Sequence, residues 1–318
     1  MTTTDTRQLL DNVRREVAKV VVGQEPTVYG LLAALLAGGH VLLEGVPGVA
    51  KTLMVKALGA ALRLDVRRVQ FTPDLMPSDV TGNLVYESGT GRFDFRPGPI
   101  FTNVLLADEI NRTPPKTQAA LLEAMEERQV SVEGEAHGLP VPFLVVATQN
   151  PVEFEGTYPL PEAQLDRFLM KLRVGYPSSD DEKTILRRHD EGLDPHDLEA
   201  AGVTAVAGAD EIATARSEVR EVTVSDDIVD YLTSLAGETR GSPSLALGVS
   251  PRGTAMLLHV AKAWAYLHAR DYVVPDDVKA LVAPAWRHRI QVRPEAELDG
   301  ATPDGVLSGI VERTEVPR

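Results

Sequence analysis

A phosphate-binding loop is the most specific chemical signal in the sequence. Residues 45–52 read GVPGVAKT, which fits the pattern G-x-x-x-x-G-K-[ST] except that Ala50 stands where the second glycine is expected. In such a loop, successive backbone N–H groups and the start of a helix form an anion-binding nest. Lys51 would reach the β- and γ-phosphates of a nucleotide, and the Thr52 hydroxyl would ligate Mg²⁺. We expect Ala50 to be tolerated if its backbone is near helical and its methyl group points away from the phosphates.

An acidic pair supplies the second half of this chemistry. In VLLADE at 104–109, four apolar residues would bury a strand and bring Asp108 out at its carboxyl end, where ligands bind in open α/β sheets. Asp108 would hold Mg²⁺ through water, and Glu109 would activate the attacking water as general base. Taken singly, one motif could be a chance turn and the other a strand ending in a solvated acidic pair. Their occurrence in this order favours a nucleotide site.

Two more polar residues follow the next predicted strands. Asn150, in VVATQNP, could contact the γ-phosphate or the water beside Glu109, although asparagine before proline is also a common turn signal. Arg167, in PLPEAQLDRF, comes directly before the last predicted strand. It could stabilise transition-state charge on the nucleotide of a neighbouring subunit, or it could form a surface ion pair with Asp166.

Short apolar runs predict the strands that position these residues. They lie at 40–45, 66–71, 103–108, 143–148 and 168–174. Helical stretches between them, most clearly at 116–129, predict an α/β fold with a largely parallel, five-stranded sheet. Segments 81–101 and 130–143 alternate polar and apolar residues around turn residues and predict β-hairpin inserts. Two helices are expected before the first strand, at 3–20 and 25–36.

The pattern changes after residue 176, where strands end and helical patterns take over. The predicted helices lie at 180–192, 210–222, 225–240, 251–270 and 275–290. Several begin at Ser or Asp, as capped helices do. We therefore expect a nucleotide-binding α/β domain over residues 1–176, with helices at its N-terminus, and an all-α lid domain over residues 177–318.

Composition narrows the choice of partners and compartment. The chain has 46 acidic and 32 basic residues, a formal charge of −14, and no run of Lys or Arg that would follow a nucleic-acid backbone. It has no cysteine, which excludes disulfides, thiolate metal sites and a cysteine nucleophile. The polar N-terminus lacks the apolar core of a signal peptide, and glycines and charges interrupt the most apolar region. The sequence predicts a cytoplasmic protein without membrane insertion.

Taken together, the motifs resemble the MoxR family of AAA+ ATPases, in the group with an insert in helix 2. They are GVPGVAKT, VLLADEINR, VVATQNP, YPLPEAQLDRF and VSPRG, and in this order they cover nearly the whole chain. Alanine at position 50 is usual in loops of this family. The lid motif departs from the usual Gly-Ala-Ser-Pro-Arg because it reads GVSPRG, and we expect Val249 to change packing rather than chemistry.

The resemblance implies a role for each matching position. The adenine would be bordered by Val22, Gly23 and Gln24. The phosphates would be bound by Gly45, Val46, Pro47, Gly48, Val49, Ala50, Lys51, Thr52 and Leu53. Asp108 and Glu109 would be the Walker B pair, with Thr52 and Asp108 at the metal, and Asn150 would be sensor 1. Arg252 would be sensor 2, brought over the phosphates from the lid. Arg167 would be the arginine finger, with Arg112 as a second candidate for that contact in trans.

The implied activity is that of a Mg²⁺- and ATP-dependent ATPase that assembles with itself into a ring, expected to be a hexamer. Hydrolysis of ATP to ADP and phosphate would drive chaperone-like remodelling, maturation or cofactor insertion of a client protein, often with a von Willebrand A-domain partner. One alternative is a DNA-acting motor of the same group, which the acidic composition and the absence of basic residues in the hairpin tips SGTG and EGEAHG disfavour. A second is a scaffold with a structural nucleotide, which Glu109 and Arg167 disfavour.

Overall fold

A five-stranded parallel sheet forms the centre of the N-terminal part. The computed structural model describes residues 5–89, 91–151 and 157–317. The strands run in the order β2-β5-β8-β1-β9. Their bounds are β1 (Val41–Glu44), β2 (Val66–Gln70), β5 (Val104–Asp108), β8 (Leu144–Gln149) and β9 (Met170–Arg173). All neighbouring strands are parallel, so the five predicted strands and their predicted direction are confirmed.

Side chains alternate between two apolar layers, one on each face of the sheet. On β5, for example, Val104 and Leu106 belong to one buried cluster, and Leu105 and Ala107 belong to the other. Strands that are covered on both faces are expected to be continuous apolar runs, which is how these were recognised in the sequence. Because the strands are parallel, their carboxyl ends and the polar residues that follow them share one edge.

Helices cover both faces of the sheet. The first cluster contains residues of α1 (Thr6–Ala18), α2 (Glu25–Ala37) and α3 (Lys51–Ala61). The second contains residues of α5 (Pro115–Glu127). The predicted helices are therefore confirmed with small shifts at their ends. The two residues that begin the first predicted helix, 3 and 4, lie outside the described residues.

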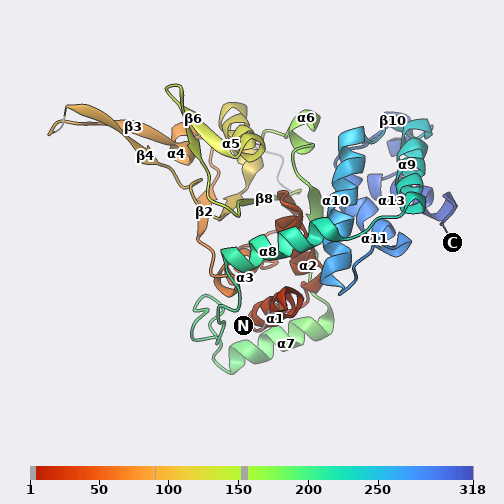
Figure 1. Cartoon of the computed structure of the whole chain (residues 1–318), viewed down its shortest axis with the longest axis horizontal. Coiled ribbons are helices and arrows are strands. Elements are labelled where there is room, and N and C mark those ends of the chain that lie inside the picture. The colour runs from red at the N-terminus through yellow and green to blue at the C-terminus, as the bar shows by residue number, and fades with distance from the viewer. Residues whose placement is uncertain (1–4, 90, 152–156, 318) are drawn as a thin grey trace.

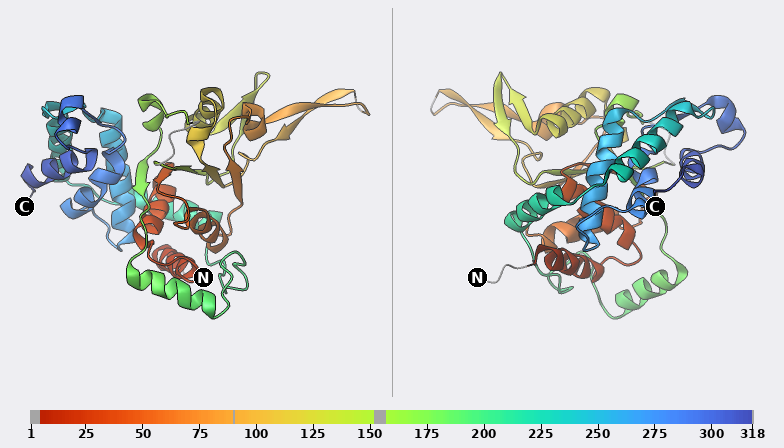
Figure 2. Two further views of the ribbon diagram at one scale, coloured as in Figure 1. Left: turned by 180° about the vertical axis from the view of Figure 1, so that it is seen from behind. Right: turned by 45° about the vertical axis from the view of Figure 1, so that its right-hand side comes forward.

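Both predicted hairpins are present. One consists of β3 (Gly82–Glu87) and β4 (Arg92–Pro97), and it projects away from the body of the molecule (Figures 1 and 2). The other consists of β6 (Gln129–Val132) and β7 (Glu135–Gly138). The rings of Phe95 and His137 stack with centroids 4.0 Å apart, so the two hairpins touch each other. The short helices α4 (Pro77–Thr81) and α6 (Glu162–Leu165) and the 3-10 turn η1 (Ile110–Arg112) were not predicted.

The C-terminal part is helical, as expected. Its elements are α7 (Ser179–Asp190), α8 (Ala209–Glu221), α9 (Asp226–Gly241), α10 (Pro251–Leu267), α11 (Pro275–Trp286), α12 (Pro294–Leu298) and α13 (Pro303–Arg313). A small two-stranded sheet of β10 (Leu245–Leu247) and β11 (Gln291–Val292) is an addition that the sequence did not predict.

The helices after residue 176 do not all lie together. Helices α9 to α13 gather at the end of the molecule opposite the β3–β4 hairpin (Figure 2). Helix α8 packs on α1 and α2 and also contacts α10, and α7 runs beside α1 (Figures 1 and 2). The division between residues 176 and 177 therefore stays a prediction. Within the described ranges, no helix combines the length and the apolar character needed to cross a membrane.

Candidate functional site

The loop between β1 and α3 has a backbone that depends on small residues. A Cβ atom on Gly45 would lie 2.4 Å from the carbonyl oxygen of Val174, and Gly48 has a φ of +84°. Ala50, at the N-terminal end of α3, has φ 61° and ψ 19°. The expectation of a near-helical Ala50 is therefore wrong, because this conformation is left-handed and costs an alanine about 1–2 kcal/mol. The loop accepts an alanine at this position, but under strain.

Lys51 lies over the loop that it follows. Its Nζ donates hydrogen bonds to the carbonyl oxygens of Gly45 (2.6 Å) and Val46 (2.9 Å). Burial lowers the pKa of Lys51, while the charges of Asp108 and Glu109 act to raise it. The lysine charge is thus held between the loop and the acidic pair.

Asp108 is buried at the carboxyl end of β5. One carboxylate oxygen accepts a hydrogen bond from the hydroxyl of Thr148 at 2.5 Å, and the other accepts one from Nη2 of Arg68 at 2.7 Å. Thr148 and Arg68 lie on the two strands that flank β5. Both were missed in the sequence, where only their position near the ends of predicted strands would have indicated them.

Glu109 follows directly and has a left-handed backbone, with φ 57°. Its N–H donates to the hydroxyl oxygen of Thr148 at 2.9 Å, which fixes the turn after β5. Its carboxylate accepts a hydrogen bond from Nε2 of Gln70 at 2.6 Å and lies 3.3 Å from Nε of Arg112. Unfavourable backbone geometry held by neighbouring residues is a common feature of functional sites.

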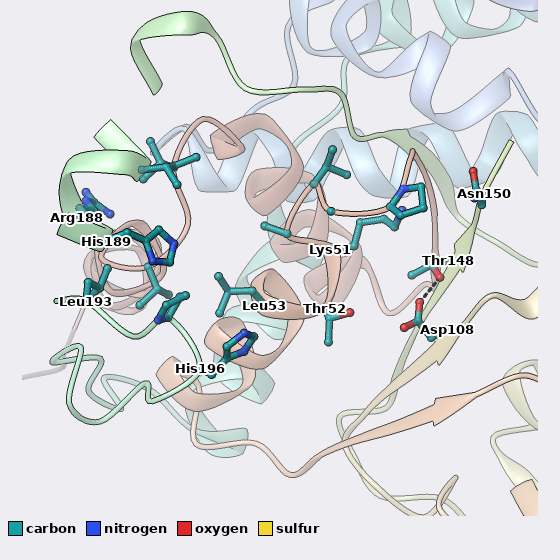
Figure 3. A pocket seen from close by; sticks show the side chains of 18 of the residues that line it. Lys51, Thr52, Leu53, Asp108, Thr148, Asn150, Arg188, His189, Leu193 and His196 are labelled. Atoms are coloured by element: carbon teal, nitrogen blue, oxygen red, sulfur yellow. Dashed lines mark hydrogen bonds between the residues drawn. The ribbon is translucent and has the colours of Figure 1, made fainter. Parts of the chain in front are cut away.

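These residues line one cavity of about 540 Å³, a volume that suits a small-molecule ligand. The predicted residues that it brings together are Val22, Pro47, Gly48, Val49, Ala50, Lys51, Thr52, Leu53, Asp108, Glu109 and Asn150. Figure 3 shows Lys51 and Thr52 in the middle, with Asp108, Thr148 and Asn150 on one side. The other side combines apolar and basic residues and was not predicted from the sequence. It is lined by Val20, Ile185, Arg188, His189, Leu193, Pro195 and His196.

Two residues expected at the adenine lie behind the cavity wall instead. A Cβ atom on Gly23 would lie 2.8 Å from the carboxylate of Asp181, so this glycine allows α7 to approach. Gln24 is buried, and its Nε2 donates to the carbonyl oxygen of Gly175 at 3.0 Å. Both residues connect the segment before α2 to the chain after β9, and Val22 is the member of this trio that lines the cavity.

Arg167 and Arg252 lie outside the cavity and next to each other. Nε of Arg167 is 2.9 Å from one carboxylate oxygen of Glu126, and Nη1 of Arg252 is 2.9 Å from the other. Arg252 therefore does not lie over the phosphate loop of its own chain, where the sequence placed it. It shares a carboxylate with the arginine that was expected to act in trans.

The donor groups suit a nucleotide with Mg²⁺. Thr52 and Asp108 line the same cavity and are the residues that would hold the ion. Among the described residues there is no group of three or more His, Asp or Glu side chains that could hold a metal by itself. Mg²⁺ bound with phosphates needs no such group, because one or two protein ligands, water and phosphate oxygens complete its shell.

Comparison with known proteins places the chain in a family. Residues 40–170 match the model of the ATPase family associated with various cellular activities (AAA), and residues 237–310 match the AAA lid domain. The protein YeaC of Bacillus subtilis is 49% identical, over 98% of this chain and 96% of its own. The chaperone MoxR1 of Mycobacterium tuberculosis is 41% identical, over 95% of this chain and 81% of its own.

A solved structure shares the fold over almost the whole length. It is a crystal structure of a protein from Cytophaga hutchinsonii, with a TM-score of 0.90 and 40% identity, and the match covers 98% of this chain and 96% of that one. The two AAA models, the near-complete match to MoxR1 and this structure agree with the phosphate loop and acidic pair found in one cavity. The chain belongs to the MoxR family of AAA+ ATPases and carries their ATPase domain.

Proposed function

We propose that the 540 Å³ cavity binds Mg²⁺-ATP and hydrolyses it to ADP and phosphate. The proposal rests on one observation. A single cavity is lined by residues that come from different elements around the sheet, namely Lys51, Thr52, Asp108, Glu109 and Asn150. On the side opposite Asp108, Val22, Ile185 and Leu193 offer apolar contacts to the adenine, and the basic side chains Arg188, His189 and His196 lie there as well. The side with the loop suits phosphates.

Each of these residues has a chemical task in the proposal. Backbone N–H groups of the loop and the charge of Lys51 would bind the phosphates, and Thr52 and Asp108 would hold Mg²⁺, which would neutralise phosphate charge. Glu109 accepts a proton from the attacking water, and Gln70 orients its carboxylate through the 2.6 Å hydrogen bond. Asn150 would contact the γ-phosphate or that water.

We further propose that Arg167 and Arg252 serve the nucleotide of a neighbouring subunit. Both lie outside their own cavity and share Glu126, so a surface that presents one of them presents the other. Guanidinium groups supplied in trans are well suited to stabilising transition-state charge on phosphate. This arrangement requires a ring, which we take to be a hexamer, and it moves Arg252 from the cis role inferred from the sequence to a role in trans. Arg112, 3.3 Å from Glu109, is then less suited to a neighbour's site.

The work done by hydrolysis is proposed to be chaperone-like action on a client protein. The relative MoxR1 is named a chaperone. The projecting β3–β4 hairpin carries exposed Tyr86 and Phe93, 57% and 65% accessible, which could contact a client. A von Willebrand A-domain protein is the partner that we propose for delivery of the client, and the cytoplasm is the proposed location.

A Glu109→Gln variant tests the assignment of the cavity. It should bind ATP as the native chain does, because the carboxamide has the same shape, and it should lose about 100-fold or more of its turnover. The measurements are phosphate release and binding of a fluorescent ATP analogue. Turnover at the native rate with native binding would show that this cavity or this base is wrongly assigned.

A further inference from the structure

A second cavity, of about 380 Å³, lies where the C-terminal end of α2 meets α5, α8 and α10. It shares no lining residue with the nucleotide cavity. Its charged lining consists of Arg128, Arg216, Arg220 and Lys262, together with His259. No carboxylate is found among the described residues that line it. We call these five side chains the basic cluster.

The basic cluster is assembled from separate elements with regular spacing. Arg216 and Arg220 are one turn apart on α8, and His259 and Lys262 are one turn apart on α10, so each pair lies on one face of its helix. Arg128 directly follows α5 as its C-terminal capping residue. Four formal positive charges therefore converge in a chain whose total is −14.

Capping of helix ends explains only part of the basic cluster. Arg216 donates to the carbonyl oxygen of Leu35 through Nε (2.8 Å) and Nη2 (2.6 Å), and Arg128 donates to that of Gly38 at 3.2 Å. Nζ of Lys262 donates to the carbonyl oxygen of Arg220. These acceptors are neutral, and a guanidinium has five N–H donors, so both charge and donors remain available. Arg220 is exposed at the rim of the cavity in the last turn of α8, where its charge complements the helix dipole and stays accessible from the cavity.

The charges in the basic cluster repel one another. Burial, followed by the charges of Arg128 and Arg220, lowers the pKa of Arg216 to about 10. A bound multivalent anion would remove this repulsion, and planar guanidinium groups match phosphate oxygens in two-point hydrogen bonds. The concave shape and the volume fit a small molecule rather than an extended chain.

We propose that the basic cluster binds a small molecule that carries two or more linked phosphate groups. This site is separate from the nucleotide cavity and does not depend on hydrolysis there. Binding would join the α/β layer, through α2 and α5, to α8 and α10. The ligand would therefore stabilise the packing of the C-terminal helices against the sheet.

Inorganic pyrophosphate is the probe for this proposal. The full chain carries Lys51→Ala, so that binding of the probe to the phosphate loop is weakened. Calorimetric titration should show saturable binding, tighter for pyrophosphate than for inorganic phosphate. In the same background, Arg220→Ala and Lys262→Ala should each weaken binding about tenfold or more. Arg293→Ala is the matched control, since Arg293 is an exposed arginine of the lid outside the cavity, and it should leave binding unchanged.

Two results would overturn the proposal. One is the absence of saturable pyrophosphate binding by the Lys51→Ala chain, and the other is binding that Arg220→Ala does not weaken. A short polyglutamate peptide provides the contrasting probe. If it binds in an Arg220-dependent way while pyrophosphate does not, the basic cluster receives an acidic protein segment and the phosphate proposal is wrong.

Discussion

At the scale of single residues, two residues that line the nucleotide cavity have a left-handed backbone conformation. Ala50 and Glu109 have φ values of 61° and 57°, and both line the cavity. Glycine would remove the strain at position 50, whereas the base proposed at position 109 requires a carboxylate. The Thr148 hydroxyl holds the strained backbone of Glu109 in place, because it accepts a hydrogen bond from the N–H of Glu109 and donates one to the carboxylate of Asp108.

An Ala50→Gly variant should therefore be more stable than the native chain. Relief of the left-handed alanine should raise the free energy of unfolding by about 1 kcal/mol, as measured by denaturant unfolding. The control is Ala213→Gly in α8, where the backbone is helical and glycine should lower that free energy by about 1 kcal/mol. A loss of stability in Ala50→Gly would contradict the conformation described for the loop.

Glu126 should act as a positioning residue for the arginine pair. Its two carboxylate oxygens hold Arg167 and Arg252, so Glu126→Gln should loosen both guanidinium groups and lower kcat about tenfold, with KM for ATP nearly unchanged. Glu123→Gln, one turn earlier on the same helix, is the control and should keep the native kcat. A rise in kcat would mean that Glu126 restrains the pair, and an unchanged kcat would mean that it has no part in their placement.

Sequence patterns identified the site residues that belong to one continuous motif. They missed the residues that reach the site only through the pairing or packing of distant segments. Lys51, Thr52, Asp108 and Glu109 were predicted because strand, loop and helix follow one another directly. Gln70 reaches Glu109 only through strand pairing, in which it lies opposite Asp108. The position of Arg252 depends on how the lid packs, which no local pattern in the sequence specifies.

At the scale of elements, strand β1 is anchored by a buried histidine at its start. His40 accepts a hydrogen bond from the N–H of Val145 at 3.0 Å through Nδ1, and its Nε2 lies 3.2 Å from the carbonyl oxygen of Met125. Burial lowers the pKa of His40 from 6.5 to about 4. The neutral ring therefore joins β1 to β8 and to the end of α5.

This burial predicts a dependence of stability on pH. The unfolded chain takes up a proton on His40 below about pH 6.5, while the folded chain does so only near pH 4. The stabilisation is complete above pH 6.5 and falls as the pH drops to about 4, by roughly 3 kcal/mol. In a His40→Asn variant, which keeps an acceptor for Val145, the free energy of unfolding should decline less over this range. Equal declines in the two chains would contradict the prediction.

Elements were predictable in proportion to their length and regularity. The five strands and the long helices were found because apolar runs and helical periodicity extend over several residues. Strands β10 and β11 are only three and two residues long, and α12 spans five, so their patterns are too short to read. Helix α13, although longer, has only Leu307 and Ile310 buried and was also missed.

At the scale of the whole molecule, the described structure divides the proposed catalytic groups between two surfaces. The cavity presents Lys51, Asp108 and Glu109, and a separate surface presents Arg167 and Arg252. A single subunit would then be a poor catalyst, because its arginine pair does not reach its own cavity. Each working site would then combine the cavity of one subunit with the arginine pair of another.

Mixing two inactive variants tests this requirement most directly. Glu109→Gln removes the base but keeps the arginine pair, and Arg167→Ala keeps the base but loses an arginine. We predict that each protein alone hydrolyses ATP slowly and that an equal mixture recovers activity. If subunits assemble at random, roughly a quarter of the interfaces in the mixture pair an intact cavity with an intact arginine. A mixture no more active than its parts, with nucleotide binding retained in both, or native activity in Arg167→Ala alone, would contradict the account.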